Sequence, residues 1–199
     1  MSSRLVLASA SPRRREILQT LGIPFEVRVS STDEKRLGDE APLAYVRRVA
    51  GEKALDVAHG CEAGVFVLGA DTIVIIDGEV LGKPEDDAAS RGMLRMLAGR
   101  VHEVTTGVAL CCAGRGLQKA ITVTTRVHFR PITYDEVERY IATGEGRDKA
   151  GAYAVQGIAS GFVSGIEGSY ANVVGLPAME TIDLLTSHGV IREWPSRSA

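Results

Sequence analysis

The stretch VFVLGADTIVII, residues 65–76, decides the fold class of this chain. Its run of apolar and β-branched residues is typical of a central strand that is buried on both faces. Asp77-Gly78 follows directly, and an Asp-Gly pair at this place predicts a tight hairpin turn. Asp71 breaks the pattern, because a carboxylate on a buried strand is costly unless a cation or a metal ion pairs with it.

The pattern alone leaves three explanations of Asp71 open. It is an ion-paired residue of the core, or it marks a break that leaves it in a loop, or it serves a ligand. Gly69 and Ala70 are compatible with the third explanation, because small residues leave room for a ligand beside the backbone, but the pattern does not decide among the three. All three explanations predict that a cation lies next to Asp71.

Strands and helices alternate along the rest of the chain. The patterns predict strands at 4–9, 25–30, 66–76, 101–112 and 117–129, and helices at 12–21, 42–59, 86–97, 133–143 and 177–187. The strands on either side of residues 113–116 would form a long antiparallel hairpin, and the Gly-rich segment 144–168 is expected to be irregular. This order predicts an α/β fold with a mixed sheet.

Composition sets the broad class of the protein. With 199 residues, 45% of them hydrophobic, the chain is expected to form one domain, 1–199, whose tail after about residue 192 is frayed. A net charge of −2 argues against binding to nucleic acid through bulk charge. The sequence has no apolar run long enough to span a membrane. Its three cysteines, odd in number, favour reduced thiols over a disulfide framework.

The segment Ser11-Pro12-Arg13-Arg14-Arg15 conflicts with the helix that it opens. Ser11 is placed as the N-cap and Pro12 as the first helical residue. Each arginine in the first turn then opposes the helix dipole, at about 0.3–1 kcal/mol. A bound phosphate would reverse that sign, which favours Arg13 and Arg14 as phosphate ligands. The alternative is a solvated basic helix face, which is our interpretation of Arg15.

Two lysines and a serine-rich segment carry weaker signals. Lys83 follows the hairpin in a sequence that superficially resembles a phosphate-binding P-loop, but the glycine spacing is short and Pro84 stands where Ser or Thr should bind magnesium. Lys53 lies among apolar residues of a helix, where an ammonium group that reaches solvent is the commoner outcome. The serines of residues 157–169 do not match the G-x-S-x-G pattern of serine hydrolases.

Two further polar positions suit a nucleotide. Glu34, beside Asp33, could supply oxygen ligands to magnesium or manganese, although paired acidic residues in a loop are more often solvated. Gln156 lies in a Gly-flanked turn, and its amide group both donates and accepts hydrogen bonds, as reading a base edge requires.

Four ordered motifs, Leu7–Arg14, Gly69–Thr72, Leu81–Pro84 and Asp148–Gly157, together resemble the Maf family of nucleoside triphosphate pyrophosphatases. The resemblance runs from about Arg4 to Ile191. It implies a fold similar to the inosine triphosphate pyrophosphatases, with an elongated mixed sheet, flanking helices and a cleft between two lobes. It also implies a cytoplasmic enzyme, often a homodimer, that cuts a nucleoside triphosphate to the monophosphate and pyrophosphate with a divalent cation, Mg²⁺ or Mn²⁺.

The same resemblance assigns roles to residues of this chain. Its phosphate-binding positions are Ser9, Arg13 and Arg14, and its catalytic positions are Glu34, Lys53, Asp71 and Lys83. Asp71 takes the place of the general base, and Glu34 and Asp71 would hold the metal. Substrate choice is associated with Arg13, Thr72 and Gln156, and the Asp-Thr and Ala-Tyr-Ala-Val-Gln-Gly stretches are similar to the subgroup that acts on dTTP and UTP.

Two rival functions stay open. The sibling subgroup acts on 7-methyl-GTP and differs at both of those stretches. A regulator of cell division that binds nucleotides without turnover is the other. Asp71, Glu34 and Lys83 together favour turnover, since binding a triphosphate does not require a base beside it. We expect no membrane attachment and no stable binding of nucleic acid.

Overall fold

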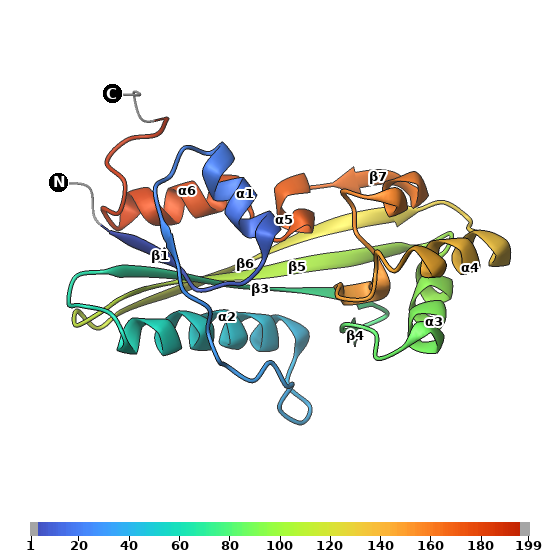
Figure 1. The fold of residues 1–199 in the computed structure, drawn as a ribbon, viewed down its shortest axis with the longest axis horizontal. Coiled ribbons are helices and arrows are strands. Elements are labelled where there is room, and N and C mark those ends of the chain that lie inside the picture. Colours follow the sequence, from blue (N-terminus) through green and yellow to red (C-terminus); the bar gives the residue numbers. More distant parts are fainter. Residues whose placement is uncertain (1–3, 196–199) are drawn as a thin grey trace. The chain divides into compact units, whose positions relative to one another are not determined.

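The computed structural model describes residues 4–195, and its strands form a seven-stranded mixed sheet in the order β2-β1-β3-β5-β6-β7, with β4 paired to β3 (Figure 1). The strands are β1 (Leu5–Leu7), β2 (Glu26–Val27), β3 (Phe66–Ile76), β4 (Glu79–Leu81), β5 (Val101–Cys112), β6 (Leu117–Phe129) and β7 (Val163–Glu167). The helices are α1 (Pro12–Thr20), α2 (Pro42–His59), α3 (Asp87–Leu97), α4 (Tyr134–Thr143), α5 (Tyr170–Val174) and α6 (Ala178–Ser187), with 3-10 turns η1 (Ala150–Ala152) and η2 (Ile158–Phe162). The α/β class with a mixed sheet is confirmed.

Both pairing directions occur around β3. On one side β1 runs parallel to β3, with Val6 opposite Val67, while β4 runs antiparallel to the end of β3. Asp77 and Gly78 join β3 to β4 with φ angles of 52° and 81°. A two-residue turn with positive φ at both positions matches the right-handed twist of the strands, so the predicted hairpin is confirmed.

The structure differs from the predictions in two strand regions, and it adds the short helix α5, which was not predicted. The first two strands are shorter than expected, at Leu5–Leu7 and Glu26–Val27. Residues 144–168 are not irregular throughout, because β7 pairs antiparallel with β6 and sets Ile166 opposite Val127. As an edge strand of mixed burial that contains a glycine, β7 lacks the alternation that marks a strand in a sequence.

The chain packs as two compact units. Among the described residues, unit 1 comprises 4–71, 106–123 and 175–195, and unit 2 comprises 72–105 and 124–174. The boundary crosses β3 between Asp71 and Thr72. Part of the tail expected to fray, residues 196–199, lies outside the described residues. Trp194 is held, since its indole Nε1 donates to the Leu21 carbonyl at 2.8 Å.

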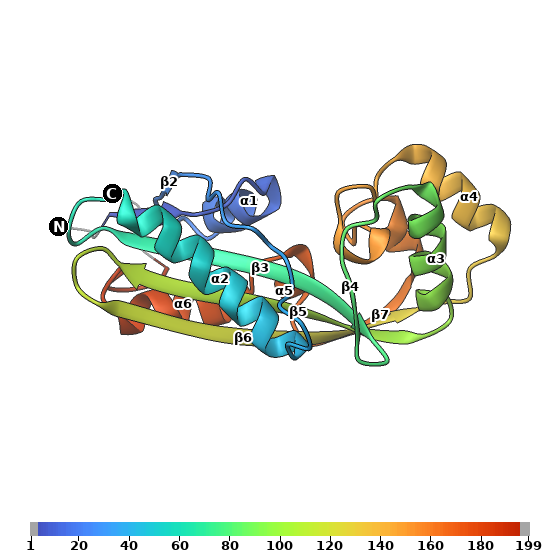
Figure 2. The same cartoon turned by 90° about the horizontal axis from the view of Figure 1, so that it is seen from below.

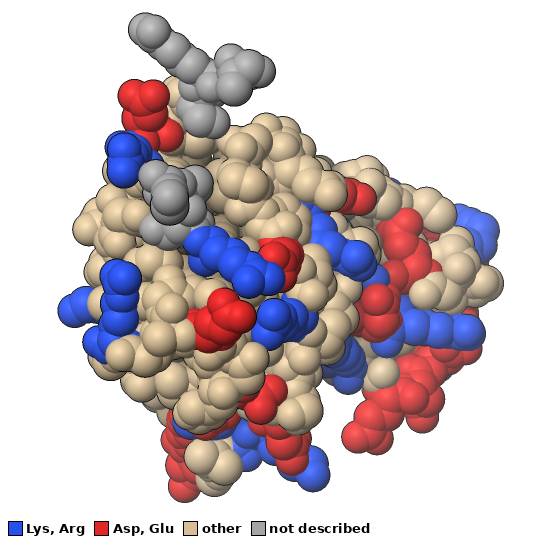
Figure 3. Space-filling view, turned by 60° about the vertical axis from the view of Figure 1, so that its left-hand side comes forward, with Lys and Arg blue, Asp and Glu red and all other residues tan. Residues whose placement is uncertain are grey.

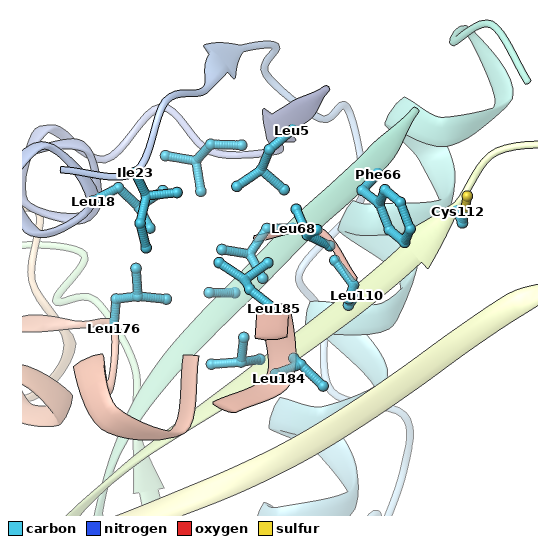
Figure 4. Close-up of a cluster of buried hydrophobic side chains, with 14 residues drawn as sticks. Leu5, Leu18, Ile23, Phe66, Leu68, Leu110, Cys112, Leu176, Leu184 and Leu185 are labelled. Atoms are coloured by element: carbon cyan, nitrogen blue, oxygen red, sulfur yellow. The ribbon is translucent and has the colours of Figure 1, made fainter. Parts of the chain in front are cut away.

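In unit 1, alternate residues of the strands face two different helix layers. Leu5, Phe66 and Leu68 belong to the core beneath α1 and α6, which Figure 4 shows, whereas Val6 and Val67 pack with α2 on the other face. Figures 1 and 2 show α2 on one side of these strands and α6 on the other. This period of two is what a strand buried on both faces requires.

Unit 2 has an aromatic interior. The rings of Phe129 and Tyr153 meet edge to face with their centroids 4.9 Å apart, and His102 lies 4.9 Å from Phe129. Nε2 of His102 and the hydroxyl of Tyr153 form a hydrogen bond of 2.8 Å. Helices α3 and α4 lie side by side in this unit (Figure 2). Arg91 of α3 forms an ion pair with Glu138 of α4.

Three features that were inferred from composition can be compared with the structure: the charge distribution, the cysteines and the apolar character of the helices. Basic and acidic side chains are interspersed on the face drawn in Figure 3. All three cysteines are free, as expected. No helix within residues 4–195 combines the length and the apolar character that a membrane crossing needs.

Candidate active site

Helix α2 approaches β3 at Gly69, and this contact sets the geometry of the site in unit 1. A Cβ atom at Gly69 would lie 2.3 Å from the Ala50 carbonyl oxygen and 2.7 Å from the Ala54 amide nitrogen. Any side chain there would force the helix away from the strand. The expectation that Gly69 leaves room for a ligand was therefore wrong, because α2 itself fills that room.

The close approach brings Lys53 to Asp71. Asp71 lies two residues beyond Gly69, on the same face of β3, and Lys53 lies between Ala50 and Ala54 on α2. Nζ of Lys53 is 2.8 Å from Oδ1 of Asp71, and both residues are 7% exposed. The predicted cationic partner of Asp71 is confirmed. Asp71 is in the strand and not in a loop, and Lys53 does not extend to solvent.

Glu34 joins the same ammonium group from the loop before α2. Its Oε1 lies 2.7 Å from Nζ of Lys53, so one lysine bridges two carboxylates. Two residues of α2 fix that loop: Tyr45 donates its hydroxyl to the Glu34 carbonyl at 2.5 Å, and Arg48 donates to the Lys35 carbonyl at 3.0 Å. Burial raises the pKa of Tyr45, and the charges of Asp71 and Glu34 raise it further.

The first turn of α1 belongs to this neighbourhood. Nη1 of Arg14 donates to Oγ of Ser9 at 3.2 Å, and its Nε donates to the Gly175 carbonyl at 2.8 Å. Burial lowers the pKa of Arg14, while the carboxylates of Asp71 and Glu34 act to raise it and Arg13 to lower it. Arg14 therefore interacts electrostatically with both predicted metal ligands and with the neighbouring arginine.

The start of α1 differs from the prediction in one respect. Ser11 occupies the N-cap position and Pro12 follows it, but the Ser11 side chain makes no capping hydrogen bond among the described residues. Oγ of Ser9 accepts the Ser11 amide instead, at 3.2 Å. Ser9, which is 6% exposed, thus joins the backbone at the helix start to the Arg14 guanidinium.

The remaining candidates belong to unit 2. Thr72 follows Asp71 on β3, Lys83 is exposed just after β4, and Gln156 is exposed between η1 and η2. A backbone hydrogen bond of 3.1 Å from Gly151 to the Gly82 carbonyl joins the turn that carries Lys83 to the loop that carries Gln156. The sequence motifs Leu81–Pro84 and Asp148–Gly157 are therefore neighbours within this unit.

Comparison with known proteins identifies the family. The family described as Maf-like protein matches residues 4–188. The chain belongs to the Maf family. The protein named dTTP/UTP pyrophosphatase from Moorella thermoacetica is 50% identical over 94% of this chain and 96% of its own length. The protein of that name from an Anaeromyxobacter species is 51% identical over 98% of this chain and 94% of its own length. The protein of the same name from Vibrio cholerae is 49% identical over 92% of this chain and 97% of its own length.

A solved structure offers a more distant comparison. The nucleoside-triphosphatase, or dITP/XTP pyrophosphatase, of Mycobacterium abscessus shares 16% identity at a TM-score of 0.41. The match covers 63% of this chain and 72% of that protein.

The carboxylates of this Maf protein are donors of the kind that a divalent cation uses. No group of three or more His, Cys, Asp or Glu side chains within residues 4–195 is arranged to hold an ion. Asp71 and Glu34 offer two carboxylates that share the Lys53 ammonium. Magnesium is commonly held by one or two carboxylates together with the phosphate oxygens of a nucleotide.

Sequence reasoning missed the residues that hold the site of this Maf protein in place. Tyr45, Arg48 and the Gly175 carbonyl do so through side-chain to backbone hydrogen bonds. The sequence offered one signal for Arg48. It is a charged residue one turn after Tyr45, on the helix that follows the acidic loop. It could not be distinguished from an ordinary solvated arginine.

Proposed function

We propose that this chain hydrolyses dTTP and UTP to the nucleoside monophosphate and pyrophosphate. Membership of the Maf family and identities of about 50% to proteins named dTTP/UTP pyrophosphatase support the substrate. The polar cluster of unit 1 supports the chemistry. The observation on which the proposal depends is that Lys53 bridges Asp71 and Glu34, and that Arg14 of α1 interacts electrostatically with both carboxylates.

In the proposed reaction a water molecule attacks the α-phosphorus, and the bond from that phosphorus to the oxygen bridging the α- and β-phosphates breaks. Asp71 orients the water and accepts its proton. Lys53 holds Asp71 and Glu34 in place and offsets their charge. Phosphoryl transfer needs positioning and charge stabilisation above all, so a covalent nucleophile is not required.

Cationic groups would neutralise the leaving pyrophosphate. Arg13 adds positive charge at the start of α1, where the helix dipole also favours an anion. Arg14 fixes Ser9 and the Gly175 carbonyl, so its contribution is to position as well as to attract phosphate. The family resemblance assigns the same electrostatic role to Lys83.

A divalent cation, Mg²⁺ or Mn²⁺, fits Asp71 and Glu34 as protein ligands. Bound there with the triphosphate, it would act as a Lewis acid that stabilises charge on the phosphate oxygens. We expect that chelation with EDTA abolishes turnover and that addition of either ion restores it.

The decisive experiment measures pyrophosphate and phosphate separately for a panel of dTTP, UTP, dCTP, GTP and 7-methyl-GTP with Mg²⁺ or Mn²⁺. We expect pyrophosphate to be released fastest from dTTP and UTP. Preference for 7-methyl-GTP would support the sibling activity, and binding without turnover would support a regulator. Release of phosphate instead of pyrophosphate would overturn the proposed position of cleavage.

We assign the choice of base to Gln156. The imide edge of thymine or uracil carries an acceptor, O4, and a donor, N3–H, which an amide side chain can pair and a carboxylate cannot. Gln156→Glu is expected to lower kcat/KM for dTTP and UTP selectively. Gln118→Glu, the same change at an exposed position of β6, is the matched control. An unchanged nucleotide preference in Gln156→Glu would remove this contact.

The proposal also covers the oligomeric state, the localisation and the binding of nucleic acid. The family resemblance predicts a cytoplasmic homodimer, which sedimentation of the purified chain tests. The net charge of −2 predicts weak association with DNA that depends little on salt. A steep salt dependence would argue for nucleic-acid binding.

A further inference from the structure

Glu145 and Tyr140 of unit 2 accept hydrogen bonds from backbone amides on both sides of Gln156. Glu145, just after α4, accepts the Ile158 amide at 2.8 Å and the Ala159 amide at 3.2 Å. It also accepts the hydroxyl of Tyr140 at 3.0 Å, and that hydroxyl accepts the Ala154 amide at 3.3 Å. The backbone is therefore held two residues before Gln156 and two and three residues after it.

Gly157 allows the loop to lie directly on this carboxylate. A Cβ atom at Gly157 would lie 2.0 Å from Oε2 of Glu145 and 2.3 Å from its Cδ, which no side chain could tolerate without displacing Glu145. The contact with the Glu145 carboxylate therefore explains why a glycine occupies position 157, next to Gln156.

Buried aromatic side chains pack beneath the loop. The ring of Tyr140, which is buried, meets Phe162 edge to face with the centroids 5.3 Å apart. Tyr153 and Phe162 on either side of Gln156 are buried too, while Gln156 itself is exposed. The surrounding residues anchor the segment inward and leave the one amide side chain on the surface.

From this arrangement we infer that Glu145 is a positioning residue for nucleotide choice, which acts by fixing the backbone that presents Gln156. The inference rests on the proposed function of Gln156 and extends it to a residue outside the four sequence motifs. Glu145 touches no substrate in this account. Its carboxylate receives three donors, and a glutamine in its place offers one acceptor oxygen and turns an NH₂ group toward N–H donors.

The test compares Glu145→Gln with Glu138→Gln. Glu138 lies on α4, and its carboxylate pairs with Arg91 of α3 at 2.9 Å, so the control breaks an ion pair of the same unit without touching the loop. We expect Glu145→Gln to raise KM for dTTP and UTP about tenfold with kcat nearly unchanged, and to reduce the preference over dCTP by a similar factor. Glu138→Gln is expected to keep the wild-type preference. Loss of thermal stability in Glu145→Gln with unchanged preference would show a merely structural role and overturn the inference.

A double-mutant cycle tests whether Glu145 acts through Gln156. If it does, adding Glu145→Gln to Gln156→Ala changes the nucleotide preference little beyond Gln156→Ala alone. Additive effects would overturn the inference, since they would mean that Glu145 influences selectivity by another route.

Hydrogen exchange separates this inference from the proposed function. In Glu145→Gln the amides of Ile158 and Ala159 are expected to exchange faster than in wild type, while those of α4 do not change. Unaltered exchange would overturn the inference whatever the turnover. Failure of the wild-type chain to release pyrophosphate from dTTP and UTP would overturn the proposed function, and the exchange result would still report whether Glu145 fixes the loop.

Discussion

The candidate residues of unit 1 and unit 2 are held in opposite ways. In unit 1, Asp71 and Lys53 are buried charges that position each other at 2.8 Å across a helix and a strand. In unit 2, Gln156 is exposed and neutral, and its place depends on hydrogen bonds to the backbone of its neighbours. Under the proposed function, reaction chemistry belongs to paired side chains on a helix and a strand, and nucleotide choice belongs to a side chain whose loop is held by its neighbours.

The two arrangements also differ in how they fail. A buried ion pair contributes little net stability, yet removing one partner leaves a desolvated charge, which costs several kcal/mol. A hydrogen bond to a loop amide contributes about 1 kcal/mol, so its loss changes local order more than global stability. Substitutions in unit 1 should therefore abolish activity or stability, and those around the loop should alter preference.

The largest expected effect is that of Asp71→Asn. Asparagine keeps an oxygen for Lys53 but cannot accept a proton, so we expect kcat to fall about 10³-fold, within the range for loss of a general base. The melting temperature should stay near wild type because the side chain is isosteric and Glu34 still pairs with the Lys53 ammonium group, so no buried charge is left alone. Measurement of pyrophosphate release gives kcat.

Asp33→Asn is the matched control for that prediction. Asp33 is exposed beside Glu34 and pairs with Lys35 at 3.4 Å, so the same change there should leave turnover intact. Activity retained in Asp71→Asn would remove Asp71 from the chemical step and weaken the contrast between the units.

Lys53→Met should have the next largest effect. Methionine keeps the apolar stem of the side chain but leaves Asp71 and Glu34 without the ammonium group that bridges them. We expect the free energy of unfolding to fall by about 3 kcal/mol, as for other buried pairs that lose one member. Chemical denaturation at pH 7 measures this change.

Lys35→Met is the comparison for Lys53→Met. The Lys35 side chain is 86% exposed in its pair with Asp33, and surface pairs of this kind contribute little. Equal destabilisation by the two substitutions would mean that burial does not distinguish the cluster of unit 1.

The sequence predicted the polar cluster better than its supports. Asp71 was conspicuous because a charge on an apolar strand needs a cation, and the structure supplies Lys53. The choice of Lys53 could not be derived from local pattern, because it depends on how closely α2 packs against β3 at Gly69, which the pattern within either segment does not specify.

The same limit explains Glu145 and β7. Glu145 looks like an ordinary acidic residue after a helix, and its role emerges when η2 folds back over the end of α4. Strand β7 is defined by its pairing with β6 and not by its own composition. In both cases the deciding interactions are hydrogen bonds to backbone groups, which leave no mark on the identity of the partner residue.

The smallest expected effect is on the pH dependence of stability, through His102 of unit 2. Burial, together with a smaller effect of the nearby His128, lowers its pKa to about 4 from an ordinary value of 6.5. The unfolded chain therefore binds a proton between these two pH values that the folded chain does not. Stability from this source is complete above about pH 6.5 and decreases as the pH falls toward 4.

Between pH 7 and pH 5 this linkage should remove about 2 kcal/mol from the free energy of unfolding. Carboxylates of the whole chain also titrate as the pH falls, so the contribution of His102 is the difference between wild type and His102→Gln, whose amide can still bond to the Tyr153 hydroxyl. His59→Gln, at an exposed position, should keep the wild-type pH dependence. If His102→Gln kept it as well, the aromatic interior around His102 would already accept a charge, and the distinction between the buried ion pair of unit 1 and the neutral aromatic interior of unit 2 would fail.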